Sequence, residues 1–473
     1  MEIKEPIIDY LQSCIEGIGF RDLHDFVLDK DLCVLCGTCV SLCPRIDIKD
    51  KEPKLLEYDP ECSMCFKYCA RTYFPEEEAE KEFFNGQTRN NSLLGYYQKA
   101  NAAKSTDEAI LKVAQNGGVV STLLIHALNT GLIDGALLTG RDENWHPKPF
   151  IARTPEEVLT AAGSRYTIAS SLLTYKEAIY EYELENLAFV GMPCQIQAAR
   201  KLQLWPPLSD KLGKFKLIIG LYCSSNYSYN LMRKTVQEEL RIPINDVKKI
   251  DISRGKFLAY KKDGSVKEIP IKETKVHNWP SCQYCKDYTA EFADISVGSV
   301  GAPADDWNSV IIRSDIGVKL FNDAVTAGKI TVADTIDLSK VEKESLRKKS
   351  KLTKMDEKVI SAIQLLNVSE IEAKTYTTLM SLGYADISML SKVMKVEETE
   401  INNVLNTLQQ REWILKTKGV YNPINPTQLI KSEIYKFQKN IKKLKSDGLI
   451  DLEKLFIQNN LMHMGYKGFM DLI

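Results

Sequence analysis

The sequence predicts an α/β core with a mostly parallel sheet, preceded by a small cysteine-rich domain and followed by a mainly helical one. Three observations predict this arrangement. Eleven of the twelve cysteines fall in tight groups, and seven of them lie within residues 27–75. Residues 93–340 alternate helical patterns with short β-rich runs, which favours parallel strands joined by helices. After residue 354, the expected helices follow one another directly.

The composition is that of a soluble globular chain with several domains. The 473 residues are 44% hydrophobic and 26% charged, with a formal net charge of −1. Because the net charge is close to zero, the overall electrostatic field does not favour binding to nucleic acid or to an anionic membrane. The N-terminus is polar and acidic, so we expect no signal peptide, and no apolar stretch is long enough to span a bilayer. These features predict a cytoplasmic protein without direct membrane insertion.

The first cysteine group has the spacing of a bacterial ferredoxin. Cys33, Cys36, Cys39 and Cys43 form a C-x2-C-x2-C-x3-C run that ends before Pro44. This spacing lets three thiolates hold one [4Fe-4S] cubane while the fourth reaches a neighbouring cluster. Structural zinc sites instead use pairs of cysteines far apart, and disulfide scaffolds are small and secreted. The run therefore predicts a ferredoxin-like iron–sulfur domain.

The second cysteine group is imperfect. It reproduces the last three positions of the same run, but Asp59 stands where the first cysteine would be. A carboxylate can ligate iron, so this site is either a cubane with one Asp ligand or a [3Fe-4S] cluster. Alternatively, Asp59 is a solvated turn residue beside Pro60. The ferredoxin pattern assigns ligands crosswise: cluster one takes Cys33, Cys36, Cys39 and Cys69, and cluster two takes Asp59, Cys62, Cys65 and Cys43.

Four more cysteines lie in the α/β region. Cys194 directly follows a predicted strand at 187–191, and Cys223 ends the next predicted strand. The carboxyl ends of parallel strands are where ligands bind. Cys282 and Cys285 add two thiolates from a loop, and four thiolates suffice for one further cubane. On spacing alone, Cys194 and Cys223 are also compatible with ordinary buried core cysteines.

The C-terminal region resembles a winged-helix domain of the archaeal transcription-regulator type. Ser369 and Glu372 have the spacing of a capping box ahead of an amphipathic helix. Helices are expected at 387–394 and 397–413, and residues 414–423 have strand-turn-strand character. The charged segment from Lys340 to Lys354 is predicted to be a linker. The lysine-rich tail after residue 430 is predicted to be helical.

The charge of this winged helix argues against DNA binding. From Glu357 to Pro423 there are seven Lys/Arg against eight Asp/Glu, and helix 397–413 is net acidic. Phosphate contacts need the opposite sign. We therefore expect no nucleic-acid partner and instead a protein-docking module, which forms a homodimer or a complex. Its aromatic residues Trp413 and Tyr421 are the expected contact surface.

Several motifs of the first 330 residues occur in the order and spacing of one known family. They are Gly117-Gly-Val-Val-Ser-Thr-Leu-Leu, Ala162-Gly-Ser-Arg-Tyr, Gly191-Met-Pro-Cys-Gln-Ile-Gln-Ala, Gly220-Leu-Tyr-Cys, Arg254-Gly-Lys-Phe and the run from Cys282 to Gly298. The series closely resembles the beta subunit of coenzyme F420-reducing hydrogenase and its dehydrogenase relatives, over about residues 30–330. Asp59 and the appended winged helix depart from that pattern.

The resemblance implies FAD in the α/β domain, next to a cubane held by Cys194, Cys223, Cys282 and Cys285. It also implies reversible hydride exchange between FAD and the deazaflavin coenzyme F420. Deazaflavins and nicotinamides carry hydride, whereas cubanes carry single electrons, so a flavin must stand between them. The other electron carrier would be ferredoxin or another redox subunit.

The same motifs indicate residues that would contact these cofactors. Glycines at a helix start let backbone N–H groups approach a pyrophosphate. Arg254 and Lys256 are the expected catalytic residues, which would meet the anionic tail of the deazaflavin, although a solvated basic turn explains them equally well. Gln195 is alternatively a cap of its own turn. The expected flavin contacts are Gly117, Gly118, Ser121, Ser164, Arg165, Tyr166, Pro193 and Gln195.

Together these features predict four segments and leave two other functions open. The segments are residues 1–92 (N-terminal helix and ferredoxin-like domain), 93–345 (FAD-binding α/β domain with an internal cluster), 355–425 (winged helix) and 426–473 (helical tail). In one alternative, NAD(P)H or an organic substrate replaces the deazaflavin. In the other, the chain is a redox-sensing regulator that binds DNA, which its acidic helix disfavours.

Overall fold

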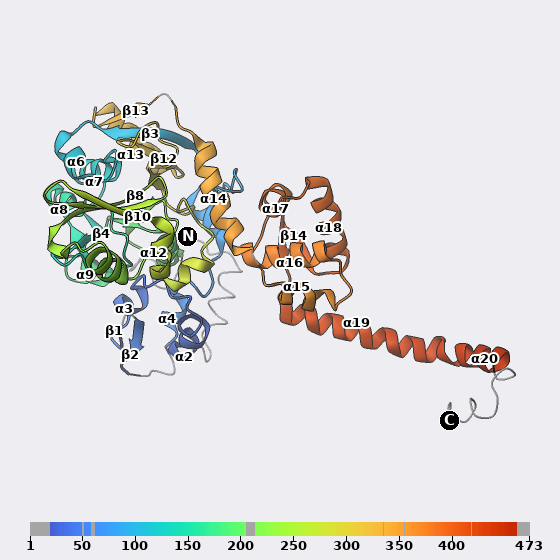
Figure 1. The fold of residues 1–473 in the computed structure, drawn as a ribbon. Helices are drawn as coiled ribbons and strands as arrows, with labels where there is room; N and C mark the ends of the chain where they lie inside the picture. Colours follow the sequence, from blue (N-terminus) through green and yellow to red (C-terminus); the bar gives the residue numbers. More distant parts are fainter. Residues whose placement is uncertain are drawn as a thin grey trace. The chain divides into compact units, whose positions relative to one another are not determined.

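The computed structural model describes residues 19–49, 52–57, 62–204, 213–333, 335–353, 355–417 and 419–460. The chain divides into two compact units, Met1–Leu352 and Thr353–Ile473, and each is described by itself (Figure 1). Most of the helix expected in residues 1–26 lies outside the described residues, as does Asp59.

The N-terminal part of the first unit is small and is packed largely from cysteines. Leu23, Val27, Ile46 and Cys65 are buried together, and further cysteines pack around them. So small a core holds few apolar side chains, which is typical of domains that are stabilised by bound metal. Its elements are α2 (Phe20–Leu23), the π-helix η1 (His24–Leu28), α3 (Thr38–Leu42), the hairpin β1 (Ile46–Lys49) and β2 (Glu52–Leu55), α4 (Met64–Lys67) and α5 (Glu76–Phe83).

An eight-stranded sheet forms the centre of the first unit, in the order β13-β3-β12-β11-β7-β6-β4-β5. The four central strands β11, β7, β6 and β4 run parallel, and antiparallel strands flank them on both sides. The strands are β3 (Lys99–Ser105), β4 (Gly135–Arg141), β5 (Pro147–Ala152), β6 (Leu187–Gly191), β7 (Phe215–Leu221), β11 (Ile295–Gly298), β12 (Asn308–Ile312) and β13 (Ile330–Ala333).

The sheet is therefore mixed, and the expectation that it is mostly parallel is corrected. Three of its seven neighbouring pairs are parallel and four are antiparallel. The short connection between β4 and β5, residues 142–146, shows why neighbouring strands of this sheet can be antiparallel. A loop of this length reverses the chain, whereas a parallel neighbour needs a crossover of a dozen or more residues.

Helices cover both faces of this sheet, and side chains alternate between the faces along each strand. Leu137, Phe189 and Ile218 pack in the layer of α9 and α10, whereas Leu138 and Ala188 pack in the layer of α7, α8 and α13. The helices are α6 (Glu108–Val113), α7 (Val119–Asn129), α8 (Pro155–Thr160), α9 (Tyr175–Tyr180), α10 (Pro193–Leu204) and α13 (Asp315–Thr326).

A three-stranded antiparallel sheet, in the order β10-β9-β8, lies beside the large one. Phe257 and Ala259 of its middle strand are buried against Leu231 and Val236 of a π-helix. The elements of this region are η2 (Leu231–Glu239), η3 (Ile244–Asp246), β8 (Val247–Ser253), β9 (Lys256–Lys261), β10 (Val266–Pro270), α12 (Ile271–Thr274), η4 (Lys275–His277) and η5 (Pro280–Tyr284).

The segment predicted to be a charged linker is instead the helix α14 (Leu338–Leu352). Val341 and Ser345 are fully buried on it, and Lys348 and Lys349 are almost so. The Nζ of Lys349 donates to Oε1 of Glu291 at 2.7 Å. The high charge density of this segment suggested an exposed linker. A lysine can nevertheless bury its aliphatic stem when its ammonium group has a hydrogen-bonding or charged partner.

The second unit has the expected helices followed by a strand-turn-strand wing. Ser369 and Glu372 form the predicted capping box, in which each side chain accepts from the other's backbone N–H. Trp413 and Tyr421 are 1% exposed, so the expectation that they form a contact surface is wrong. The elements are α15 (Glu357–Gln364), α16 (Glu370–Leu382), α17 (Ile387–Met394), α18 (Glu398–Gln410), β14 (Ile414–Thr417), β15 (Val420–Pro423), α19 (Pro426–Asp447) and α20 (Leu449–Asn460).

The tail is helical as expected, over α19 and α20. Its helix α19 has the length of a membrane span but carries six lysines. Among the described helices of the chain, none is both long and apolar enough to cross a bilayer.

Candidate functional site

Four cysteines, named here the core cysteines, line one cavity in the first unit. Strands β6 and β7 are parallel, and Gly191 lies opposite Gly220 at their ends. One core cysteine lies in the first turn of α10, just after β6, and another follows the end of β7. The ends of parallel neighbours meet at one edge of a sheet, so both thiols reach the same cavity. The other two cysteines come from η5 and from the residue that caps its C-terminal end. The core cysteines are Cys194, Cys223, Cys282 and Cys285.

Backbone contacts hold η5 against the loop that follows β7. The N–H of Asn226 donates to Sγ of Cys282 at 3.3 Å, and its carbonyl accepts from the N–H of Trp279 at 2.8 Å. The N–H of Cys223 donates to the carbonyl of Tyr288 at 2.9 Å. The loop and the helix therefore present their thiols as one fixed set.

The core cysteines have strongly perturbed pKa values. Burial raises the pKa of Cys194 well above its usual range, and the charge of Cys285 adds to this. Burial raises the pKa of Cys223 to about 12, although Lys348 opposes it. Burial acts in the same direction on Cys285, but Lys348 and Arg71 outweigh it and lower its pKa. Four thiolates in one buried space repel one another, so full ionisation requires added positive charge, which a metal cluster supplies.

Two cations that no sequence motif singled out border the cavity. The Nζ of Lys348 donates to the carbonyls of Cys223 and Asp287 at 2.6 and 2.7 Å. Nε and Nη2 of Arg71 are shielded from solvent and have no hydrogen-bond partner among the described residues. Burial alone would lower the pKa of Arg71, but the thiolates of the core cysteines and of Cys69 raise it. Arg71 follows the second cysteine run by two residues, and Lys348 lies in the expected linker, so neither had a distinct sequence signal.

The N-terminal cysteines form two neighbouring groups. In the first, named group one, burial raises the pKa of Cys39 well above its usual range, and the charges of Cys36, Cys69 and Cys33 add to this. Burial likewise raises the pKa of Cys33 to about 12, with Cys69 as the strongest neighbouring charge. Group one therefore contains the four residues that the ferredoxin pattern assigns to cluster one.

The second group, named group two, holds the remaining N-terminal cysteines. Burial raises the pKa of Cys65 to about 12, and the charges of Cys62 and Cys43 add to this. These are the three cysteines that the ferredoxin pattern assigns to cluster two. Asp59 lies outside the described residues, so its role as a ligand stays a prediction. The eleven cysteines of the described part are all free of disulfide bonds.

Group one packs directly on the α/β core. The Nε1 of Trp279, a residue that lines the core cavity, donates to the carbonyl of Cys33 at 2.7 Å. The N–H of Leu172 donates to the carbonyl of Cys36 at 2.9 Å. The two cysteine sets therefore belong to one continuous structure.

Two residues expected to contact a flavin, Ser164 and Tyr166, lie near Gln115. Its Oε1 accepts from the N–H of Ser164 at 3.2 Å, and its Nε2 donates to the carbonyl of Ile250 at 3.3 Å. The hydroxyl of Tyr166 lies 3.5 Å from Oδ1 of Asp251. The loop before α7, the segment 164–166 and strand β8 thus form one neighbourhood, named the Gln115 neighbourhood.

The Gln115 neighbourhood is linked to the core cysteines through the backbone. The carbonyl of Tyr166 accepts from the N–H of Tyr227 at 2.9 Å. The preceding residue, Asn226, is the one that holds Sγ of Cys282, and Ile168 lines the core cavity. A group bound in this neighbourhood would lie beside the core cysteines.

Arg165 is suited to an anionic group. Its Nη1 donates to the carbonyls of Ala161, Ala162 and Gly163, while its buried Nε has no partner among the described residues. Burial lowers the pKa of Arg165 to about 10, and the charge of Arg141 adds to this. A half-buried guanidinium beside a second cation is a favourable place for a phosphate.

The start of α7 is less open than the glycine pair suggested. Gly118 has φ of +72°, as its place before the helix requires. A Cβ on Gly117 would meet backbone atoms of Ala103 and Asn308 at 2.9 Å. Oδ1 of Asn308 accepts from the N–H of Val119 at 3.3 Å. Gly117 is therefore needed for close packing against the sheet, and Ser121 in the next turn is buried.

Other expected site residues have structural partners. Oε1 of Gln195 accepts from the N–H of Met192, and its Nε2 donates to the carbonyl of Ala169, both at 2.9 Å. Gln195 thus caps its own turn, the alternative role left open by the sequence. Its neighbour Pro193 lines the core cavity.

Arg254 and Lys256 lie at the turn between β8 and β9. The side chain of Arg254 is 86% exposed and lies 3.8 Å from Asp305, while Lys256 pairs with Glu268 on β10. Both cations are thus solvated, as the alternative interpretation of this turn expected. Arg254 is nevertheless near the loop before α7, since Asn116 donates to the carbonyl of Asp305 at 2.7 Å.

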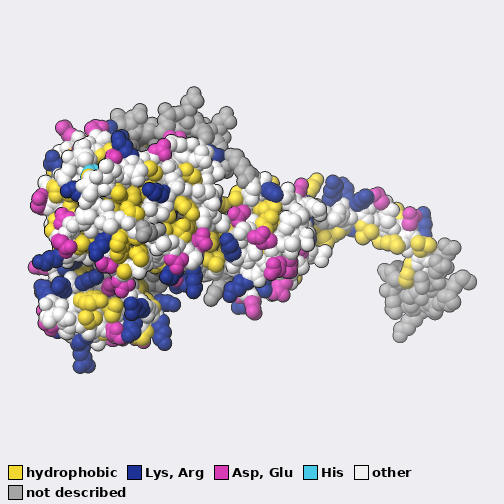
Figure 2. Space-filling view, turned by 90° about the horizontal axis from the view of Figure 1, so that it is seen from above, with side chains coloured by type: hydrophobic (Ala, Val, Ile, Leu, Met, Phe, Trp, Pro, Cys, Tyr) yellow, Lys and Arg dark blue, Asp and Glu magenta, His cyan; other side chains and the backbone are white. Residues whose placement is uncertain are grey.

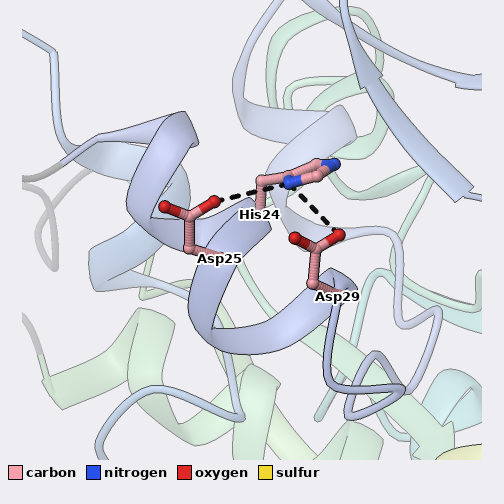
Figure 3. A group of neighbouring side chains, drawn as sticks. All are labelled: His24, Asp25 and Asp29. Carbon is pink, nitrogen blue, oxygen red and sulfur yellow. Dashed lines mark ion pairs between the residues drawn. The ribbon is translucent and has the colours of Figure 1, made fainter.

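One further group of ligand-type side chains lies on the surface of η1 (Figure 3). Nδ1 of His24 is 3.6 Å from Asp25 and 3.4 Å from Asp29, and these side chains are 45% to 61% exposed. Surface ion pairs of this kind are common, so the group needs no metal to explain it.

Family models match most of the chain. The beta subunit of coenzyme F420 hydrogenase/dehydrogenase is matched by its N-terminal model at residues 100–175 and by its C-terminal model at residues 184–337. A 4Fe-4S binding domain matches residues 26–45. The sugar-specific transcriptional regulator TrmB matches residues 363–429, in the unit with the wing.

The similarity to known proteins covers nearly the whole length of each of them. The beta subunit of the coenzyme F420 hydrogenase of Methanococcus voltae is 42% identical, over 54% of this chain and 93% of that protein. A component of the F(420)H(2) dehydrogenase of Methanosarcina mazei is 34% identical, over 70% of this chain and 91% of that protein. A chain in the solved F420-reducing [NiFe] hydrogenase complex from Methanosarcina barkeri is 36% identical with a TM-score of 0.53, over 57% of this chain and 94% of that one. On these matches, the chain belongs to the family of coenzyme F420 hydrogenase/dehydrogenase beta subunits.

Proposed function

We propose that the chain is a flavin- and iron–sulfur-dependent oxidoreductase, which transfers electrons between reduced coenzyme F420 and ferredoxin or a partner redox subunit. One observation carries this proposal. The core cysteines line a cavity that has the Gln115 neighbourhood on one side and group one on the other. The names of the similar proteins support coenzyme F420 as the hydride carrier.

The donor sets fit three iron–sulfur clusters. Thiols in groups of four, four and three, all at least partly buried, with cations beside the core cysteines, match the sulfur ligands and the charge balance of such clusters. In the proposal, the core cysteines and group one each hold a [4Fe-4S] cluster. Group two, completed by Asp59 or lacking a fourth protein ligand, holds a [4Fe-4S] or a [3Fe-4S] cluster.

FAD fits the Gln115 neighbourhood. Arg165 offers a half-buried cation to its phosphates, and Ser164 and Tyr166 offer polar groups for its ring or its phosphates. A flavin supplies the exchange between a hydride and single electrons. The chain's own part is to hold the flavin beside the core cysteines and to orient the hydride carrier at its exposed side.

Arg254 is the proposed contact for the anionic tail of coenzyme F420. It is an exposed cation beside the loop that precedes α7, so the tail can reach it while the deazaflavin ring approaches the flavin. Lys256, on the same turn, adds a second positive charge. Electrostatic contacts of this kind mainly raise the affinity for the anionic carrier and its association rate.

This proposal is tested by comparing hydride donors in the native protein and in a variant of Arg254. Flavin reduction in the anaerobic holoprotein is followed after mixing with reduced coenzyme F420, NADH or NADPH. We expect reduced coenzyme F420 to act fastest, and Arg254→Gln to raise the concentration of it that gives half the maximal rate. Lys262→Gln, in the turn between β9 and β10 of the same sheet, is the control and should leave that concentration unchanged. Faster reduction by NADH or NADPH would replace the proposed hydride donor.

For the second unit, the proposed partner is a second copy of this chain, bound through α19. Its exposed apolar residues recur with the 4-3-4-3 spacing of a coiled coil, and Figure 2 shows hydrophobic side chains along this helix. In heptad terms, Ile434 and Ile441 are at a and Phe437 is at d, with branched a positions as two-stranded coils prefer. The exposed residues that form this seam are Ile430, Ile434, Phe437, Ile441 and Leu444.

The charges of α19 favour a parallel pair. Four of its six lysines lie at outer positions of the heptad. In a parallel pair, Glu433 of one copy faces Gln438 of the other, whereas an antiparallel pair sets Lys431 against Lys445. Ile434→Glu should convert a dimer to a monomer in light scattering, while Tyr435→Ser, exposed but outside the seam, should not. A dimer that survives Ile434→Glu would exclude this helix as the interface.

A further inference from the structure

The boundary between group one and the core cysteines contains a buried positive charge. Two residues of the N-terminal part, Val34 and Arg71, line the core cavity together with Trp279. Val34 directly follows Cys33 in the chain, and Trp279 bonds to the carbonyl of Cys33. The two cysteine sets are therefore separated by little more than these side chains.

Arg71 is in contact with both sets. Its own N–H donates to Sγ of Cys69 at 3.4 Å, on the side of group one. Its guanidinium lines the cavity of the core cysteines, with Nε and Nη2 shielded and unpartnered among the described residues. Arginine N–H groups that are buried without an acceptor are costly, so this arrangement is explained when an anionic group occupies the cavity.

Two other cations each act on one side of this boundary. The Nζ of Lys201 donates to the carbonyl of Cys69 at 2.7 Å and to Oγ1 of Thr72 at 3.1 Å. On the other side, Lys348 donates to the carbonyl of Cys223. Lys201 is thus a cation of group one, Lys348 is a cation of the core cysteines, and Arg71 is shared.

We propose that Arg71 is a positioning residue that sets the reduction potentials of two clusters at once, the one held by group one and the one held by the core cysteines. The inference rests on the proposed clusters, though not on the identity of the hydride donor. One-electron reduction adds a negative charge to a cluster, and a fixed cation in a low-dielectric interior stabilises the reduced form. Arg71 therefore raises both potentials together.

The test is a redox titration of the anaerobic full-length holoprotein, monitored by electron paramagnetic resonance. Arg71→Gln removes the charge and should lower the midpoint potentials of both clusters. Lys201→Gln should lower only that of the group one cluster, and Lys348→Gln only that of the core cluster. Arg71→Lys keeps a positive charge and should restore most of the loss. Unchanged potentials in Arg71→Gln, or a shift of one cluster alone, would overturn the inference.

A second measurement needs no variant. Arg71 contacts Cys69 through its backbone N–H and lines the cavity of the core cysteines with its side chain, so the two reduced clusters should lie close enough for their unpaired spins to interact. The fully reduced native protein should therefore show broadened or split signals, and magnetically isolated signals would refute the shared cation. Iron content is measured on every sample, because it separates a failure of the proposed function from a failure of the role of Arg71. Too little iron for these clusters would contradict the proposed function. Full iron content with potentials that do not shift as stated would contradict only the role of Arg71.

Discussion

Cys282→Ser changes a single atom of the core cysteines and leaves the rest of the first unit in place. Its Sγ accepts from the N–H of Asn226 at 3.3 Å, a contact that a serine hydroxyl can keep in part. Groups one and two contain no residue of η5, so their own ligands are untouched. The substitution therefore tests the core cluster separately from the N-terminal ones.

The number of iron atoms that Cys282→Ser should lose follows from the number of cysteine groups that hold a cluster. Three cubanes correspond to about twelve iron atoms per chain, or about eleven if the cluster of group two has three irons. Losing the core cluster lowers this by about four. The signals of the N-terminal clusters should persist, the flavin should still be reduced by its hydride donor, and onward transfer to the external carrier should slow greatly.

Anaerobic purification with iron, sulfide and flavin assays measures this outcome. Cys14→Ser is the control for replacing a thiol, because Cys14 lies outside the cysteine groups in the sequence. Full retention of iron in Cys282→Ser would show that the core cysteines do not hold a cluster. Fully reconstituted wild-type protein with no more than about four irons would exclude the three-cluster account altogether.

Three other substitutions or truncations have defined outcomes. Asp59→Cys should convert a three-iron signal in electron paramagnetic resonance into a four-iron one, and an unchanged spectrum would place Asp59 away from the cluster. Ser369→Ala removes the capping box of α16 and should destabilise the second unit by about 1 kcal/mol in denaturant unfolding, with no effect on iron. A chain that ends after Lys354 should keep flavin, iron and flavin reduction but lose the dimer; salt-sensitive binding of the second unit to duplex DNA would instead support the regulator alternative.

The cysteine pattern was informative because ligand spacing is a local property. The run from Cys33 to Cys43 can fold around a cluster in few ways, and burial raises the pKa of Cys33 and Cys39, with the charges of Cys36 and Cys69 adding to this rise. Spacing and predicted strand ends allowed Cys282 and Cys285 to join Cys194 and Cys223 in one further cubane, and the family motifs implied that set across almost ninety residues. That connection depends on which strands are neighbours, and hydrophobic patterns do not reveal strand order.

What the sequence did not reveal depends on tertiary contacts. The direction of strand pairing follows from connections that a hydrophobic pattern does not define, which is why the sheet is mixed. Lys348 lies in a segment whose charge density suggests a linker, yet its ammonium group is buried beside Cys223. Trp413 was expected at the surface and is in the core of the second unit. The residue types in a segment do not reveal whether such side chains are buried or exposed, because burial of a charge or a ring requires a partner from elsewhere in the chain.

The most direct test of electron transfer through the chain is rapid mixing of the oxidised, fully loaded protein with reduced coenzyme F420, in the absence of any other carrier. Flavin absorbance and cluster signals are recorded together in stopped-flow and freeze-quench samples. The account predicts that the flavin is reduced first and that the core and group one clusters become reduced afterwards within the same reaction. Reduced flavin with clusters that stay oxidised, in protein of full iron content, would contradict it.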